Sequence, residues 1–201
     1  MFATKDRINL LKLPTCVDCN NHSSNDDEYL RSIIISRADV NETQSTTELR
    51  EALMRSLSNV SKSGFQKAYA RAIGVKRVFT PAGIYLGNHP VLSVNNVRLE
   101  RILSKIIRGL YYHHMKKVLN NKYLIKIISE DNIKLQTPKF KEFIKSKIFY
   151  YLDQTYLFEI GKNTFNYKYL LTREDNKAGA WILRFYGKVH FLGMVLHEHS
   201  I

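Results

Sequence analysis

The chain has 201 residues, 44% of them hydrophobic, which is enough for one domain with a sizeable core and argues against global disorder. Lys and Arg number 31 against 18 Asp and Glu, so the formal net charge is +13. This charge suits a polyanionic partner such as nucleic acid, although an anionic membrane surface, an acidic protein or a merely soluble basic surface fits the same number.

Membrane and secretory classes are disfavoured by the distribution of apolar residues. No apolar run approaches the roughly 18 residues that a bilayer crossing needs, and the N-terminus lacks the long apolar segment of a secretory signal. Two cysteines, Cys16 and Cys19, are also too few for the disulfide framework of a small secreted domain. We therefore expect a cytoplasmic protein with no membrane partner, in which these cysteines are reduced thiols or metal thiolates.

Residues 1–37 are predicted to form a small N-terminal unit. The apolar run "INLLKLP" is typical of an extended arm or strand, and Pro14 ends it. The stretch "SSNDDEYLRSIIIS" predicts a helix that begins at Ser24 or Asn25, because either residue can cap a helix and the three acids that follow suit the positive end of its dipole. The acids are thus explained without a catalytic role.

Residues 38–201 are predicted to form an α+β domain. A capping-box helix within 45–60 precedes a short helix and a turn-rich region with strands, and "NVRLERILSKIIRGLYYHHMKKVL" has the periodicity of a long amphipathic helix. A strand, "KYLIKIIS", and a second basic helix, "PKFKEFIKSKIFYYL", follow. The last 50 or so residues contain four aromatic and β-branched runs separated by turn residues, which predicts an antiparallel meander.

The long helix carries a candidate nucleic-acid surface. Its basic residues recur at steps of three, four and three, so they share one face, and eight basic residues stand against one acid between 98 and 126. We expect this ridge to contact the phosphates of DNA, unless its cations only solvate an amphipathic helix. The ridge residues are Arg98, Arg101, Lys105 and Arg108.

The sequence "CVDC" places two thiols at the spacing that zinc sites use. Cys16 and Cys19 can reach one tetrahedral zinc ion, but a closed structural site needs four ligands, and no histidine of the chain stands at a zinc-finger spacing from them. A homodimer that shares one zinc between four cysteines would complete the site. Otherwise the two cysteines are ordinary thiols.

The residues around the cysteine pair resemble a known family. The stretch "DRINLLKLPTCVDCNNHSSNDDEYLR" is similar to the second half of the ββα-metal motif of zinc-stapled HNH endonucleases, in particular a bacterial group. Cys16 and Cys19 match the second zinc pair, Asn9 matches the middle Asn of the motif, and Asn20 stands at its last His or Asn. The resemblance implies a partial ββα zinc knuckle, structural zinc, and in complete relatives a histidine and a divalent ion such as Mg²⁺ that hydrolyse a phosphodiester.

The resemblance covers about an eighth of the chain and departs from the family at one decisive point. Residues 1–15 contain no cysteine and no histidine, so the first zinc pair and the catalytic histidine have no counterpart. An internal start codon, a decayed gene or a shortened form that works without nuclease chemistry would each explain this. We expect an HNH-related nucleic-acid-binding protein that is catalytically incomplete; the alternative is a non-enzymatic binding or interaction module with a vestigial knuckle.

Overall fold

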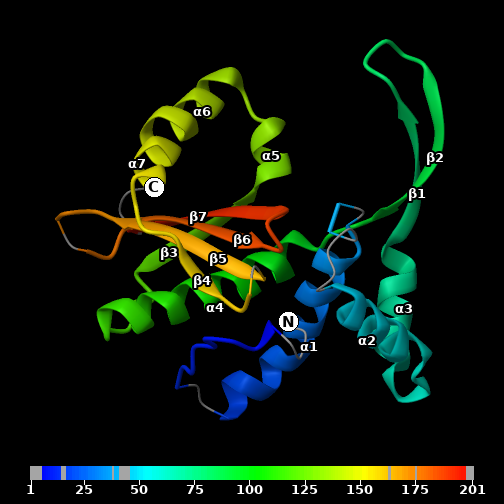
Figure 1. Ribbon diagram of the computed structural model, residues 1–201, viewed down its shortest axis with the longest axis horizontal. Coiled ribbons are helices and arrows are strands. Elements are labelled where there is room, and N and C mark those ends of the chain that lie inside the picture. The colour runs from blue at the N-terminus through cyan, green and yellow to red at the C-terminus, as the bar shows by residue number, and fades with distance from the viewer. Residues whose placement is uncertain are drawn as a thin grey trace.

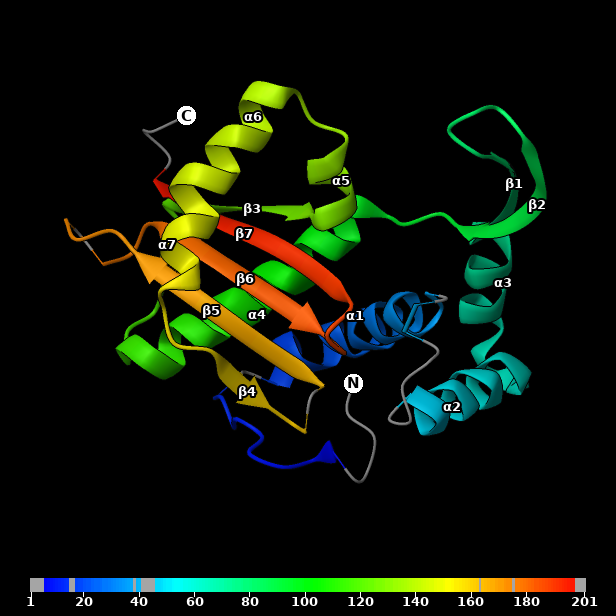
Figure 2. The same cartoon turned by 45° about the horizontal axis from the view of Figure 1, so that its top comes forward.

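The computed structural model describes residues 6–14, 17–37, 39–40, 46–162, 164–174 and 176–197, with the side chains of 18–25 and 62 outside the description. The predicted α+β class is confirmed. A five-stranded antiparallel sheet lies between two layers of helices, and a second, two-stranded sheet stands apart from it (Figures 1 and 2).

The five-stranded sheet contains the predicted C-terminal meander. Its four consecutive strands pair as neighbours, and a fifth strand from the middle of the chain pairs antiparallel with the last one, so the order is β3-β7-β6-β5-β4. Strand pairing brings aromatic residues into register, as where Tyr169 lies opposite Trp181 and Trp181 opposite Gly193. The strands are β3 (Tyr123–Ser129), β4 (Phe158–Ile160), β5 (Phe165–Leu171), β6 (Gly179–Phe185) and β7 (Val189–His197).

One face of this sheet is covered by α4 (Asn96–Met115), the predicted long helix. Its start is capped by the Asn95 side chain, which accepts a hydrogen bond from the Arg98 backbone N–H, and its end is marked by Lys116 in the left-handed region. Leu103 and Ile107 are fully buried against the sheet. Helix α1 (Val17–Ile35) packs beside α4 and shares this core across the predicted boundary at residue 38.

The opposite face is covered by a chain of short helices. They form a second core in which Ile144 and Leu152 pack with Ile182 and Leu192 of the sheet. The chain turns into this layer at Thr137, whose side chain accepts a hydrogen bond from the Phe140 N–H. The helices are α5 (Glu130–Lys134), α6 (Pro138–Phe143), the π-helical segment η4 (Ile144–Phe149) and α7 (Tyr150–Asp153).

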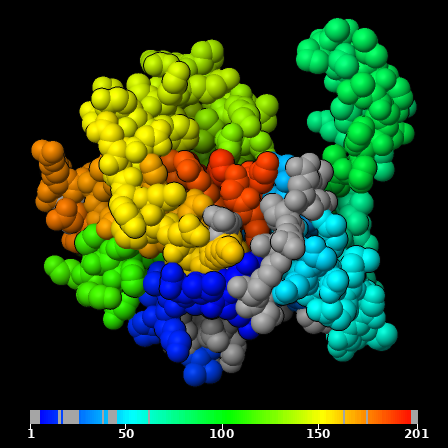
Figure 3. Space-filling model, viewed as in Figure 1, coloured from blue at the N-terminus to red at the C-terminus, as the bar shows by residue number. Residues whose placement is uncertain are grey.

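The remaining elements lead away from the sheet. Helix α2 (Thr47–Ser58) and a 3₁₀ turn, η3 (Val60–Lys62), precede α3 (Ser63–Ala72), which runs directly into β1 (Ile73–Phe79) and β2 (Tyr85–Leu92). The antiparallel pair of β1 and β2 projects from the body beyond α3, as the space-filling view shows (Figure 3). We call α3, β1 and β2 together the arm.

The predicted start of the first helix is wrong. Helix α1 begins at Val17, so the backbone of Cys19 is helical, and the acids expected at its N-terminus lie further along, where Asp26 faces α4. The described residues 6–14 contain no strand, and the chain bends at Asn9, which has a φ of 54°. The Ile8 carbonyl accepts a hydrogen bond of 2.9 Å from the Gly161 N–H beside β4. Lateral packing against α4 thus explains the acid at position 26 better than the helix dipole does.

We predict that Gly193→Val will destabilise the fold, because a Cβ at this position of β7 would clash with the Ile107 side chain of α4. Overpacking of a buried site costs about 1–3 kcal/mol, which urea unfolding followed by circular dichroism will measure. Gly64→Ala is the control, since a Cβ there meets no atom within 4 Å on the exposed helix α3. An unchanged unfolding midpoint for Gly193→Val would show that α4 does not lie this close to β7.

Candidate nucleic-acid interface

The first half of the predicted basic ridge faces an acid of the same protein. Asp26 of α1 accepts hydrogen bonds from Arg98 Nε at 2.6 Å and from Arg101 Nε at 2.8 Å and Nη2 at 2.9 Å. The Asp26 side chain is only 10% exposed, whereas that of Arg101 is 64% exposed. One carboxylate therefore joins two successive turns of α4 to α1.

The environment of Asp26 favours its charged form. Burial alone would raise the pKa of this carboxyl, but the hydrogen bonds from Arg101 and Arg98 outweigh burial and hold the pKa below its usual range. The Arg98 guanidinium also lies 4.3 Å from the centre of the Tyr29 ring, and the Tyr29 hydroxyl accepts a 2.6 Å hydrogen bond from the Asn95 N–H. The first turn of α4 is thus fastened to α1 at several points.

The second half of the ridge is also engaged inside the protein. Arg108 donates to the Leu119 carbonyl at 2.6 Å and to the Tyr123 carbonyl at 2.9 Å, which ties the loop after α4 to the start of β3, and burial lowers its pKa. Lys105 is partly buried near Asp27, and its charge counteracts the burial that raises the pKa of that acid. The prediction that the ridge binds nucleic acid stays a prediction, but its cations already have protein partners.

The sequence does not reveal that Asp26 pairs with Arg98 and Arg101, because Asp26 lies 72 and 75 residues away from them. The spacing of Arg98, Arg101 and Arg108 correctly places them off the apolar stripe of α4. It carries no information about α1, which covers part of that face in the fold. Basic residues spaced three and four apart therefore indicate a shared helix face. The spacing does not show whether another helix of the protein covers that face.

The arm presents a second basic surface that we did not predict. Its four cations are exposed, and no Asp or Glu occurs anywhere in the sequence between Glu51 and Glu100. This acid-free stretch is the signal by which the surface could have been found. The exposed, described cations of the arm are Lys67 and Arg71 on α3 and Lys76 and Arg77 on β1.

The arm consists of a two-stranded ribbon, β1 and β2, and of helix α3, which joins the ribbon to the body. The Ser36 and Tyr69 hydroxyls lie 2.7 Å apart and join α1 to α3, and the Ser93 N–H donates to the Ala72 carbonyl at 2.7 Å where β2 returns. Beyond these contacts, β1 and β2 pair from Ile73 opposite Leu92 outward to a turn in which Gly83 adopts a φ of 84°. A substantial length of ribbon is therefore free to contact a partner on both faces.

Apolar side chains are exposed along the ribbon to an unusual extent. Val75 is 71% exposed, Ile84 64% and Phe79 53%, and the Phe79 and Tyr85 rings contact each other at 5.4 Å between centroids. An isolated two-stranded ribbon is marginally stable in water, and contiguous exposed apolar surface commonly marks a binding site. The arm thus combines an apolar and aromatic surface with exclusively positive formal charge.

The residues that match the HNH motif lie mostly outside the described part. Cys16 is not described, nor are the side chains of Cys19 and Asn20, whose backbones are in α1; Asn9 is exposed and has a φ of 54°. Cys16 and Cys19 would supply thiolates to zinc, but the remaining ligands are not identified, since no three His, Cys, Asp or Glu of the described chain gather closely enough to hold a metal. Zinc and Mg²⁺ stay predictions.

Comparisons with protein-family models, with curated proteins and with solved structures found no match. The HNH resemblance therefore stays a prediction that depends on the residues quoted above. Among the helices of the described ranges, none combines the length and apolar character needed to cross a bilayer.

We predict that Asp26→Asn lowers the free energy of unfolding at neutral pH by about 1–3 kcal/mol, because charged hydrogen bonds to Arg98 and Arg101 are lost. The folded-state pKa of Asp26 lies below its unfolded value, so this stability is present above pH ~4 and disappears as pH falls through the folded pKa. Urea unfolding of both proteins across this pH range will measure it. Glu51→Gln, which removes the exposed 3.8 Å pair with Arg55, should change stability by less than about 0.5 kcal/mol; an equally small effect at Asp26 would contradict the prediction.

Proposed function

We propose that this chain binds nucleic acid, with DNA as the first candidate, through the arm. The observation that carries the proposal is the acid-free basic sequence of a ribbon that projects from the body. The net charge of +13 favours the approach of a polyanion from any side, and the arm concentrates cations that have no acidic neighbour on their own element.

The shape of the arm suits a groove of double-stranded DNA. A two-stranded antiparallel ribbon is one of the two protein elements that the major groove admits. Successive residues point to opposite faces of a strand, so Lys76 and Arg77 place one cation on each face of the ribbon, opposite His89 and Asn88 respectively. Each face of the ribbon can therefore bring one cation to the DNA phosphates that flank a groove.

The exposed apolar and aromatic residues are compatible with the same partner. Phe79 and Tyr85 stand together near the turn of the ribbon, where their rings can stack on bases or pack on sugars, and Tyr85 donates a 2.8 Å hydrogen bond to the Asn88 side chain. Pro81 stands in the turn itself, at the distal end of the arm. Apolar side chains at such a position are suited to the wedge contacts that minor-groove proteins make.

The charge of the arm argues against its pairing with a second copy. Two arms placed face to face would bring two sets of cations together without any acid between them, because the sequence from 52 to 99 has none. Like charges facing each other across an interface cost affinity. A polyanion neutralises the same cations and releases its own counterions, which contributes favourably to binding.

We predict that Lys76→Glu/Arg77→Glu weakens the binding of a short DNA duplex by at least ten-fold and lowers the slope of log affinity against log salt by about two, since each phosphate contact contributes roughly 0.9. Fluorescence anisotropy of a labelled duplex at several salt concentrations measures both quantities. Lys145→Glu/Lys147→Glu is the matched control, because it changes the net charge equally at two exposed residues of the helical layer.

Two outcomes would overturn the proposal. Affinity that does not depend on salt would exclude a phosphate-dominated interface, and equal losses in the arm variant and the control would mean that only net charge matters. Tight binding of the wild-type chain to anionic vesicles or to an acidic polypeptide, with no binding to DNA or RNA, would reassign the arm to another class of partner.

We further propose that the chain as printed binds DNA without cutting it, because the HNH motif's catalytic histidine has no counterpart in residues 1–15. Supercoiled plasmid incubated with the protein and Mg²⁺ should remain supercoiled on an agarose gel. Nicking that disappears in EDTA and persists through successive purification steps would contradict this expectation and restore the enzymatic interpretation.

A further inference from the structure

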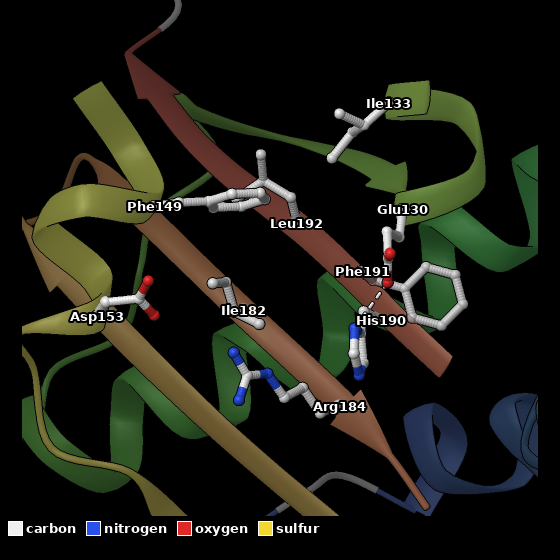
Figure 4. Close-up of a pocket in the computed structure, with 9 residues that line it drawn as sticks. All are labelled: Glu130, Ile133, Phe149, Asp153, Ile182, Arg184, His190, Phe191 and Leu192. Carbon is white, nitrogen blue, oxygen red and sulfur yellow. Dashed lines mark ion pairs between the residues drawn. The ribbon is translucent and has the colours of Figure 1, made fainter. Parts of the chain in front are cut away.

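A cavity of about 230 Å³ lies between the sheet and the short helices on the face opposite α4. Its walls are mainly apolar: Ile182 and Leu192 rise from the sheet, and Ile133 and Phe149 descend from α5 and η4. Figure 4 shows the Arg184 side chain along the floor of this cavity beside Ile182, with Phe149 and Leu192 above it in the view.

A row of polar residues crosses this face of the sheet, and two of its members, Arg184 and His190, line the cavity. Strand register places Glu159 opposite Asn166, Asn166 opposite Arg184, and Arg184 opposite His190, so one polar line crosses β4, β5, β6 and β7 on the same face. The line continues into α5, where Glu130 Oε2 lies 2.7 Å from His190 Nδ1. Lys168, which pairs with Ile182, is a further polar residue on this face of the sheet.

Two atoms of this row are buried without a hydrogen-bond partner among the described residues: Arg184 Nε and Asn166 Oδ1. Buried polar atoms are nearly always paired, so these two atoms are exceptions. Arg184 as a whole is only partly buried, and its Nη atoms are not among the buried atoms that lack a partner. The Arg184 side chain has neither a hydrogen bond nor an ion pair within the part of the chain that the structure describes. The acids that line the cavity do not pair with Arg184, since other cations are their neighbours.

Each of the two acids that line the cavity, Glu130 and Asp153, lies close to a lysine. Lys134 Nζ lies 3.0 Å from Glu130, which also faces His190, and the hydrogen bond from Lys134 contributes most to lowering the pKa of Glu130. Asp153 lies 3.7 Å from Lys168 Nζ. Arg184 is thus the cation of the cavity whose charge is not balanced, and a single negative charge on a ligand would balance it.

The size and lining of the cavity restrict the ligand further. Its volume is below the roughly 300–1,000 Å³ of sites for drug-sized molecules, so a smaller ligand is expected. Glu130 and Asp153 also line the cavity, so they would repel a dianion such as phosphate more strongly than a monoanion of half its charge. The apolar walls suit an apolar body next to the charge, and a planar carboxylate matches the geometry of a guanidinium.

We propose that the cavity between β6, β7 and the short helices binds a small organic carboxylate with an apolar body, whose carboxylate pairs with Arg184. This site is separate from the arm and does not depend on the proposed binding of nucleic acid. Benzoate is a suitable probe, because it combines a carboxylate with one flat apolar ring. Benzamide has the same shape without the charge, and inorganic phosphate has the charge without the apolar body.

Titration calorimetry and saturation-transfer NMR of the full chain will test the proposal. Benzoate should bind more tightly than benzamide or phosphate, and Arg184→Gln should weaken benzoate about ten-fold or more, as expected for loss of a charged hydrogen bond. Arg173→Gln, at an exposed residue of the turn after β5, should leave the affinity unchanged. Arg184→Gln should not lower the unfolding midpoint of the ligand-free protein, because it removes a cation that lacks a partner.

Arg184→Lys keeps the charge and gives a second measurement if Arg184→Gln does not fold. It should retain binding that is weaker than wild type, since an ammonium group cannot make the paired contacts of a guanidinium. Equal affinity for benzoate and benzamide, unchanged benzoate binding in both Arg184 variants, no binding of benzoate at millimolar concentration, or phosphate binding that exceeds benzoate binding would each overturn the proposal.

Discussion

The position of α4 between the five-stranded sheet and α1 is the constraint on which the other parts of the structure depend. Its apolar stripe, with Leu103 and Ile107 fully buried, fixes it across the sheet, and the absence of a side chain at Gly193 permits close approach to β7. Its opposite flank meets Asp26 and Tyr29 of α1. Because the arm returns to the body shortly before Asn95, the attachment of α4 also fixes where the arm ends.

The two faces of the sheet differ because one long helix and several short ones fill space differently. On the α4 side, the rings of Tyr169 and Trp181 stack at 4.7 Å and His114 packs on Tyr169 at 4.5 Å between centroids, so the aromatic side chains fill the layer. Burial lowers the pKa of His114, which keeps this histidine neutral within the layer at pH 7. On the other side, α5 and α7 cover the sheet incompletely, and the uncovered part contains Arg184.

The sequence predicted those elements whose signals are local. The periodicity of α4 and the four aromatic runs of the meander each arise within a dozen or two residues, and both were confirmed. The pairing of β3 with β7 joins residues about 70 positions apart, so no local pattern contains it. The same limit applies to Asp26: its helix-start interpretation used neighbours in the sequence, whereas its partners Arg98 and Arg101 come from another helix.

The candidate sites also divide into features that the sequence shows locally and features that only the fold brings together. The acid-free stretch between Glu51 and Glu100 is visible in the sequence, but only the fold shows that Lys76 and Arg77 extend away from the body on a ribbon. The polar row at Arg184 is hidden because its members come from four strands, and each of them alone is typical of a solvated strand face. Only strand register shows that Asn166, Arg184 and His190 lie side by side, and only the fold shows that short helices partly cover them.

Internal partners also decide which cations are suited to bind phosphate. If Arg98 or Arg101 moved to a phosphate, Asp26 would lose hydrogen bonds while remaining largely buried, and that cost would offset much of the new contact. No described acid pairs with Lys76 or Arg77, so a phosphate contact at the arm requires only the partial dehydration of exposed cations. Equal formal charges on α4 and on the arm are therefore unequal in binding: those on α4 mainly join helices within the fold, and those on the arm remain available to a polyanion.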